Sequence, residues 1–147
     1  MPKVLFICTH NSARSQMAEA YLRKFGGERF EVESAGIEQG HLNPYVVRAL
    51  LEEGIDISGK KTQGVSDLLK QGKSYDFVIA VCAKEAADRC PVFPGHATRL
   101  VWSNADPSTF TGSDEEIMTQ VREVRDAIKE QVRQFAVEVP SLASRHQ

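Results

Sequence analysis

The order of apolar and polar positions divides the chain into short strands and longer helices. Four apolar, β-branched runs have the length of strands: Lys3–Cys8, Phe30–Ser34, Phe77–Val81 and Arg99–Trp102. Helical spacing of apolar residues, every three or four positions, predicts helices that include Gln16–Leu22, Pro44–Glu53, Val65–Leu69 and Asp114–Val137. Strands that alternate with helices in this way predict an α/β fold with a parallel sheet covered by helices.

The last helix carries its own start signal and a clear apolar stripe. Ser113 precedes Asp114, Glu115 and Glu116, which is a capping residue followed by acids at the positive end of a helix. One face holds apolar residues at helical spacing: Ile117, Val121, Val124, Ile128, Val132 and Phe135. We expect this stripe to pack on the sheet.

Length and composition favour one globular domain. The chain has 147 residues, of which 41% are hydrophobic, so one core of ordinary size is expected. We place the domain at residues 1–140 and expect the polar tail, residues 141–147, to be frayed.

Charge and targeting signals exclude several classes of partner and location. The formal net charge of −2 gives no electrostatic basis for binding nucleic acid. There is no apolar stretch near 18 residues and no signal-peptide pattern, so we expect no membrane association and a cytoplasmic location. Three cysteines are too few for a secreted disulfide framework, and they leave catalytic or redox use open.

A thiol and a guanidinium flank the turn that follows the first strand. Five residues separate Cys8 from Arg14, which lets the turn wrap a tetrahedral anion with backbone N–H groups pointing inward. Arg14 can then bind two oxygens at once. The positive charge of Arg14 and the start of the following helix also stabilise a Cys8 thiolate relative to the thiol. The expected oxyanion site comprises Thr9, His10, Asn11, Ser12, Ala13, Arg14 and Ser15.

Two residues of this turn have expected roles besides binding the oxyanion. Asn11 tolerates left-handed backbone geometry and is expected to shape the turn more than the chemistry. Ser15 begins the next helix, where it either caps that helix or gives its hydroxyl to the Cys8 sulfur.

The other two cysteines follow the third strand. Cys82 stands at the carboxyl end of that strand and should emerge at the same sheet edge as Cys8. Between Cys82 and Cys90 lies a helix-favouring stretch, Ala83–Arg89, which would hold the two Cα atoms roughly 12 Å apart, whereas a disulfide needs less than about 7 Å. Either both are small buried apolar residues, or they form a disulfide when this segment unwinds. A zinc site is disfavoured, because no C-x2-C pair exists and His96 is the only histidine nearby.

Asp106-Pro107 follows the fourth strand across a short loop, again at the carboxyl edge. The Asp106 carboxylate could overhang the anion site as a general acid or base. An exposed Asp-Pro turn is the competing interpretation.

Together these residues resemble a known family. Cys8 to Arg14 with Ser15-Gln16-Met17-Ala18, then Ser34-Ala35-Gly36, Cys82, Cys90 and Asp106-Pro107, are similar to thioredoxin-coupled arsenate reductases built on the low-molecular-weight tyrosine phosphatase fold. The likeness runs from Lys3 to about Phe135. It implies a four-stranded parallel sheet of order 2-1-3-4.

The resemblance also implies a reaction. Cys8 attacks arsenate held by the loop and Arg14 while Asp106 assists proton transfer. Cys82 then attacks Cys8 and releases arsenite, and Cys90 attacks Cys82 to leave a Cys82–Cys90 disulfide that thioredoxin reduces. No tightly bound cofactor or metal is implied, phosphate and sulfate would compete with arsenate, and some relatives have a monovalent-cation site that involves Asn11, Glu19 and Ser34.

The chain departs from the family pattern at three places. His10 stands where many relatives have glycine. The Cys82–Cys90 interval and the stretch Ser58–Val65 are both longer than usual.

Two other functions remain open. The Cys8 loop also suits a low-molecular-weight protein tyrosine phosphatase, although Ser108 and Thr109 stand where an aromatic side chain would stack on the substrate ring. A non-catalytic module that binds oxyanions or senses redox state would use the same loop and thiols. The Cys82/Cys90 pair favours the reductase.

Overall fold

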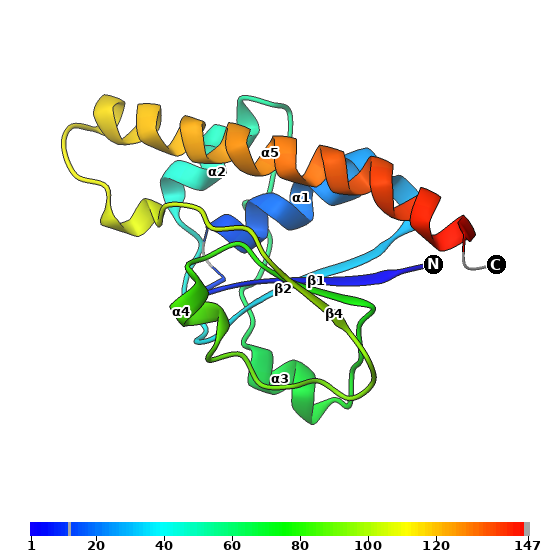
Figure 1. Ribbon diagram of the computed structural model, residues 1–147. Coiled ribbons are helices and arrows are strands. Elements are labelled where there is room, and N and C mark those ends of the chain that lie inside the picture. Colours follow the sequence, from blue (N-terminus) through cyan, green and yellow to red (C-terminus); the bar gives the residue numbers. More distant parts are fainter. Residues whose placement is uncertain (12, 146–147) are drawn as a thin grey trace.

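A four-stranded sheet forms the centre of the computed structural model, which describes residues 1–11 and 13–145 (Figure 1). The strands are β1 (Lys3–Cys8), β2 (Glu31–Gly36), β3 (Phe77–Ala80) and β4 (Thr98–Val101). The helices are α1 (Arg14–Gly26), α2 (Pro44–Leu51), α3 (Val65–Lys70), α4 (Lys84–Ala87) and α5 (Asp114–Arg145), with 3-10 turns η1 (Gly27–Arg29) and η2 (Pro107–Thr109).

All neighbouring strands are parallel, in the order β2-β1-β3-β4. This confirms the expected α/β class and strand order. In the register of the sheet, Cys8 lies opposite Gly36 of β2, and Ile7 lies opposite Ala80 of β3. The carboxyl ends of β1 and β3 are therefore neighbours, and the loops that follow them leave the sheet side by side.

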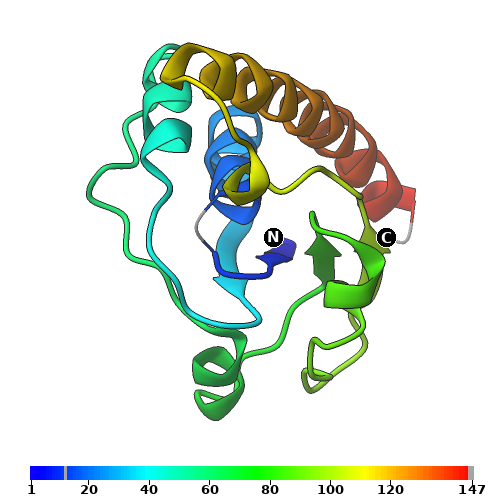
Figure 2. The same cartoon turned by 90° about the vertical axis from the view of Figure 1, so that its left-hand side faces the viewer.

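The helices form two layers. Helices α1, α2 and α5 lie on one face of the sheet, and α3 and α4 lie on the other (Figure 1). Viewed toward the carboxyl ends of the strands, the turn η2 lies beside the start of α1, and α4 lies near the ends of β3 and β4 (Figure 2). None of the described helices combines the length and the apolarity that crossing a bilayer requires.

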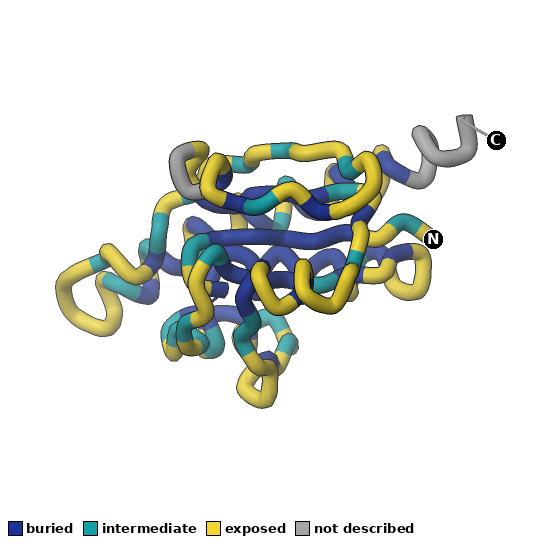
Figure 3. Tube along the Cα trace, turned by 90° about the horizontal axis from the view of Figure 1, so that it is seen from below, coloured by how far each residue is buried: buried dark blue, intermediate teal, exposed yellow. Residues whose placement is uncertain are grey.

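The core lies on both faces of the sheet, under α1, α2 and α5 on one side and under α3 and α4 on the other, where Leu68 is fully buried. The central strands are buried along their length, whereas the helices alternate buried and exposed turns (Figure 3). The predicted stripe of α5 is buried from Val121 to Phe135, and Ile117 is half-buried at its start. Fully burying one such side chain contributes about 1.5–3 kcal/mol relative to leaving it exposed, so the stripe holds α5 in place. It packs mainly on α1 and α2 rather than on the sheet as expected, and it reaches the sheet at Phe135, whose ring lies against Phe77 of β3.

The predicted capping signal of α5 is also present. The Glu116 N–H donates to Ser113 Oγ at 3.2 Å, and Ser113 N donates back to Glu116 Oε1 at 3.4 Å. This reciprocal pair satisfies two backbone donors at the helix start. At the other end α5 continues to Arg145, beyond the predicted end at Val137. Fraying of residues 141–147 stays a prediction, and residues 146–147 lie outside the described part of the chain.

The helix between the second and third cysteines is shorter than predicted. α4 covers only Lys84–Ala87, not the whole stretch Ala83–Arg89. Cys90 N donates to Ala87 O at 3.1 Å, which tightens the chain after the helix, and Pro91 cannot continue it. The separation of roughly 12 Å expected for an eight-residue helix therefore does not apply.

Candidate functional site

The first three carbonyl groups of the Cys8 loop are held from one side. Cys8 O, Thr9 O and His10 O accept hydrogen bonds from the N–H groups of Ile37, Glu38 and Gly40, at 2.8 to 3.0 Å. In a trans peptide the N–H points opposite to the carbonyl, and the described chain has no cis peptide. The N–H groups of Thr9, His10 and Asn11 therefore point away from the 37–40 segment, as an anion-binding loop requires.

The close approach of this loop depends on Gly36. A Cβ atom at Gly36 would lie 2.6 Å from Asn11 N and 2.6 Å from the carbonyl carbon of His10. Any side chain here would displace the loop from the end of β2. This position is one that the sequence analysis quoted but to which it assigned no role.

Asn11 has the left-handed conformation that the sequence predicts, with φ of 55°. Its side chain is fully buried, and Oδ1 accepts from Gln63 N at 3.0 Å and from Gln16 Nε2 at 3.1 Å. Its Nδ2 donates to Ser15 Oγ at 2.7 Å. Asn11 thus both shapes the turn and fixes the Ser15 hydroxyl beside the Cys8 sulfur.

Of the two roles expected for Ser15, the structure shows the contact with the Cys8 sulfur and not the helix cap. Its Oγ lies 2.9 Å from the Cys8 sulfur, and the N-terminus of α1 has no side-chain cap. Because Asn11 already donates to Ser15 Oγ, the Ser15 hydrogen is free to point at Cys8. A hydroxyl that donates to sulfur stabilises the thiolate.

Arg14 is buried beneath the loop that follows β4. Its Nη1 donates to Asn104 O at 3.0 Å, and its Nη2 lies 3.6 Å from Asp106 Oδ2. Asp106 also accepts from Ser108 N and Ser108 Oγ at the start of η2. The carboxylate and guanidinium expected at the carboxyl edge are therefore neighbours. The sequence analysis did not place Asn104 beside them, because it lies 90 positions from Arg14 along the chain.

Ser12, the remaining residue of the expected oxyanion loop, lies outside the described residues. His10 is half-exposed, and its Nδ1 lies 3.9 Å from Glu38 Oε2. Ala13 is buried, and its carbonyl accepts from Met17 N at 3.0 Å as the first bond of α1. The binding role of the loop itself stays a prediction.

All three cysteines are buried free thiols. Val81 N donates to Ile7 O at 2.9 Å, which carries the β1–β3 pairing up to the residue before Cys82. Cys8 and Cys82 thus leave neighbouring strands at one edge, as predicted. Burial raises the pKa of the Cys82 thiol to about 11. The charge of Arg14 lowers this pKa, and the charge of Cys8 raises it further. Burial also raises the pKa of Cys90, which Arg99 opposes.

Glu19, which the family resemblance implied only as part of a cation site, is a buried carboxylate with several partners. Glu19 Oε1 accepts from Ser34 Oγ at 2.6 Å, and Oε2 accepts from Arg23 Nε at 2.8 Å and from Lys60 Nζ. Two cationic side chains of the chain itself therefore neutralise Glu19. Across the described residues, no group of three or more His, Cys, Asp and Glu side chains is arranged to hold a metal ion.

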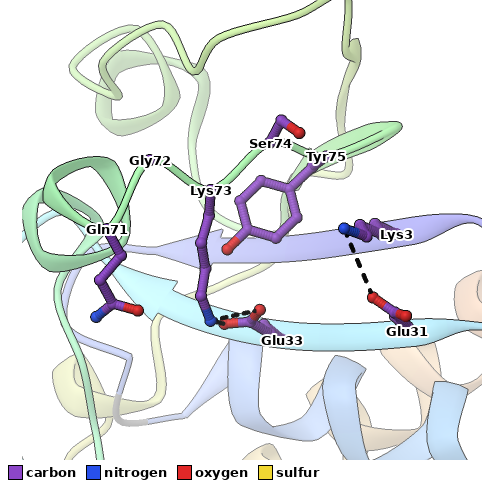
Figure 4. A pocket seen from close by; sticks show the side chains of 8 residues that line it. All are labelled: Lys3, Glu31, Glu33, Gln71, Gly72, Lys73, Ser74 and Tyr75. Carbon is purple, nitrogen blue, oxygen red and sulfur yellow. Dashed lines mark hydrogen bonds and ion pairs between the residues drawn. The ribbon is translucent and has the colours of Figure 1, made fainter.

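A separate hollow of about 310 Å³ lies at the opposite, amino-terminal edge of the sheet (Figure 4). Lys73 Nζ donates to both Glu33 oxygens at 3.0 Å, and the Tyr75 ring points toward this pair. The Tyr75 hydroxyl is buried and has no hydrogen-bond partner among the described residues. Burial, followed by the charge of Glu33, raises the pKa of Tyr75.

Replacing Tyr75 with phenylalanine should therefore stabilise the protein. The change removes a buried hydroxyl without breaking a hydrogen bond, so the free energy of unfolding should rise by roughly 1 kcal/mol. Tyr21→Phe is the matched control, because Tyr21 donates to Glu53 at 3.0 Å, and it should lower the free energy of unfolding by about 1 kcal/mol. Urea unfolding measures both, and equal losses in the two variants would contradict the prediction.

Comparison with known proteins gives a consistent result. The model of the low molecular weight phosphotyrosine protein phosphatase family matches residues 3–145. An arsenate reductase of Bacillus subtilis is 41% identical over 134 residues, which cover 90% of this chain and 94% of the relative.

Solved structures agree with the sequence match. An arsenate reductase in the oxidized state has a TM-score of 0.78 at 28% identity and covers 94% of this chain and 98% of its own. A structure of an arsenate reductase in the phosphate binding state has a TM-score of 0.75 at 29% identity, with coverage of 95% and 99%. A thioredoxin-dependent arsenate reductase of Corynebacterium glutamicum has a TM-score of 0.61 at 30% identity, with coverage of 91% and 63%.

Proposed function

Since the chain belongs to the low molecular weight phosphotyrosine protein phosphatase family, we propose that it is an arsenate reductase whose three cysteines act in succession. The observation that carries this proposal is the place of Cys82. A phosphatase reaction needs one thiol, whereas here a second buried thiol follows the strand next to the one that ends in Cys8.

In the first step the Cys8 thiolate attacks arsenic. The loop N–H groups and Arg14 hold the arsenate oxygens, and Ser15 stabilises the sulfur until it reacts. Asp106 supplies a proton to the departing oxygen, which leaves as water, and a Cys8–arsenic bond remains. The 3.6 Å contact between Arg14 and Asp106 supports this division of roles, because both groups reach the same side of the loop.

The next two steps are thiol exchanges. The Cys82 thiolate attacks the Cys8 sulfur, and the electron pair of the sulfur–arsenic bond stays on arsenic. Arsenite is released, and a Cys8–Cys82 disulfide remains in the protein. The Cys90 thiolate then attacks Cys82, which forms a Cys82–Cys90 disulfide and returns Cys8 as a thiolate. An external dithiol, for which we propose thioredoxin, reduces that disulfide. A reducing cytoplasm is the compartment that suits this cycle.

A coupled assay tests the function. Arsenate, thioredoxin, thioredoxin reductase and NADPH are mixed with the protein, and we expect one NADPH oxidised for each arsenite formed. Phosphate and sulfate should compete with arsenate. Without arsenate-dependent NADPH oxidation the proposal fails.

The same preparation distinguishes the rival functions. A phosphatase would hydrolyse an aryl phosphate rapidly, and an oxyanion-binding module would bind arsenate without turnover. Phe110, the first aromatic residue after Asp106-Pro107, packs against the core rather than standing free to stack on a substrate ring. We therefore expect aryl phosphate hydrolysis to be slow.

A further inference from the structure

Arg99 of β4 reaches the end of the short helix between the second and third cysteines. Its Nη2 donates to Ala87 O at 3.4 Å, and Cys90 N donates to the same oxygen at 3.1 Å. One carbonyl therefore brings the guanidinium of Arg99 beside the backbone of Cys90. In the ribbon, α4 lies near the ends of β3 and β4, which is the arrangement that this contact requires (Figure 2).

Two hollows of about 240 Å³ meet at Arg99. One is lined by the segment after Cys90, including Pro91, Phe93 and His96, and the other by Ala87 and Asp88 together with the ends of the strands. Arg99 is exposed and takes part in both linings. The guanidinium thus lies between the part of the chain before Cys90 and the part after it.

Burial and the nearby charge of Arg99 have opposite effects on the pKa of Cys90. Burial raises the pKa of Cys90, and Arg99 is the group that lowers it. Asp88 and His96 line the two hollows with Arg99, whereas the neighbouring Arg89 turns to Glu38 at 3.3 Å. Cys82 has a similar arrangement, in which Arg14 opposes the effect of burial. In each of the two later thiols the charge of one guanidinium, from a different element, therefore opposes the rise in pKa that burial causes.

We propose that Arg99 is a positioning residue for the third cysteine: through Ala87 O it holds the end of α4 and keeps a positive charge beside the Cys90 backbone during the exchange with Cys82. The inference rests on the proposed function. In the step concerned, the Cys90 thiolate attacks Cys82, the Cys90–Cys82 bond forms as the Cys8–Cys82 bond breaks, and Cys8 leaves as a thiolate. The proton of Cys90 passes to solvent before the attack, and no outside oxidant is needed.

The first test measures Cys90 alone. In a Cys8→Ser/Cys82→Ser background, the alkylation rate of Cys90 is followed from pH 6 to the alkaline plateau. In Arg99→Gln the ratio of the rate at pH 7 to the plateau rate should fall roughly tenfold, which corresponds to one pKa unit. Taking the ratio removes any effect of the substitution on access to the sulfur.

Two further variants separate charge from structure. Arg99→Lys keeps a positive charge and should restore most of the ratio, and Arg89→Gln removes the same charge one residue before Cys90 and should leave the ratio unchanged. Equal ratios in the parent and in Arg99→Gln would overturn the inference, and so would an equal fall in Arg89→Gln.

The second test follows the relay itself. After a pulse of arsenate without reductant, Arg99→Gln should release arsenite at the rate of the parent protein and then convert the Cys8–Cys82 disulfide to Cys82–Cys90 about tenfold more slowly at pH 7. Conversion at the parent rate would contradict the inference. Absence of arsenite release from the parent protein would instead reject the proposed function, and the alkylation ratio would still decide the role of Arg99.

Discussion

Replacing Cys8 with serine is expected to abolish arsenate reduction, with a fall in turnover of roughly 10⁴- to 10⁶-fold, as for other lost nucleophiles. The Cys8 sulfur is the one that lies 2.9 Å from the Ser15 hydroxyl, at the start of the loop whose N–H groups point away from residues 37–40. A serine hydroxyl at this place is a much weaker nucleophile at neutral pH than a thiolate. The coupled NADPH assay measures the loss.

The matched control for Cys8→Ser keeps the nucleophile and removes only its hydrogen bond. Ser15→Ala should retain measurable turnover, because the thiol and Arg14 remain in place. Binding of arsenate to Cys8→Ser, measured by calorimetry, should persist, since the loop and Arg14 are unchanged. Turnover by Cys8→Ser within tenfold of the parent protein would show that another group carries the attack.

Replacing Cys90 with serine is expected to stop the cycle after a single arsenite per protein molecule. Without Cys90 nothing within the chain resolves the Cys8–Cys82 disulfide, so this disulfide should accumulate, and steady-state turnover should fall at least 100-fold. Quenching with an alkylating reagent, followed by mass measurement of peptides, identifies which sulfurs are joined. Cys82→Ser should form neither disulfide.

The pH dependence of the Cys82 step follows from burial. Burial raises the pKa of Cys82 to about 11, so its thiolate fraction rises about tenfold for each pH unit below that value. In Cys90→Ser the release of arsenite should therefore accelerate as pH rises from 7 toward 10, if Cys82 attack limits the rate. A rate that falls over this range, or more than one arsenite per molecule in Cys90→Ser, would contradict the relay.

Local sequence signals were sufficient for most of the fold. The strand Lys3–Cys8, the start of α2 at Pro44 and the capped start of α5 at Asp114 were predicted at the residues where the structure has them. Each depends on nearby residues: an apolar run, a proline at the first helical position, and a reciprocal cap. Strand order came from the family resemblance, because periodicity gives no order.

What the sequence did not predict depends on contacts between distant segments. Glu19 meets Lys60, and Asn11 meets the backbone of Gln63, although each pair is far apart along the chain. Nothing in the local pattern of either partner indicates such a contact. The helix after Cys82 is shorter than its helix-favouring residues predict, because the chain turns after Ala87, where Cys90 N donates to Ala87 O.

The hydrogen bonds of the Cys8 loop divide the carboxyl edge into two parts. The loop is tied to the β2 side, through residues 37–40 and Gln63, whereas Cys82 and Cys90 belong to the chain between β3 and the outermost strand β4. One exposed side-chain contact joins the two parts, from Arg89 Nη2 to Glu38 Oε1 at 3.3 Å. Opening the second part would break this contact but none of the backbone hydrogen bonds that hold the Cys8 loop. Amide hydrogen exchange should therefore show two cooperative units at this edge, and new sequences could be grafted between β3 and β4 while the Cys8 loop is left intact.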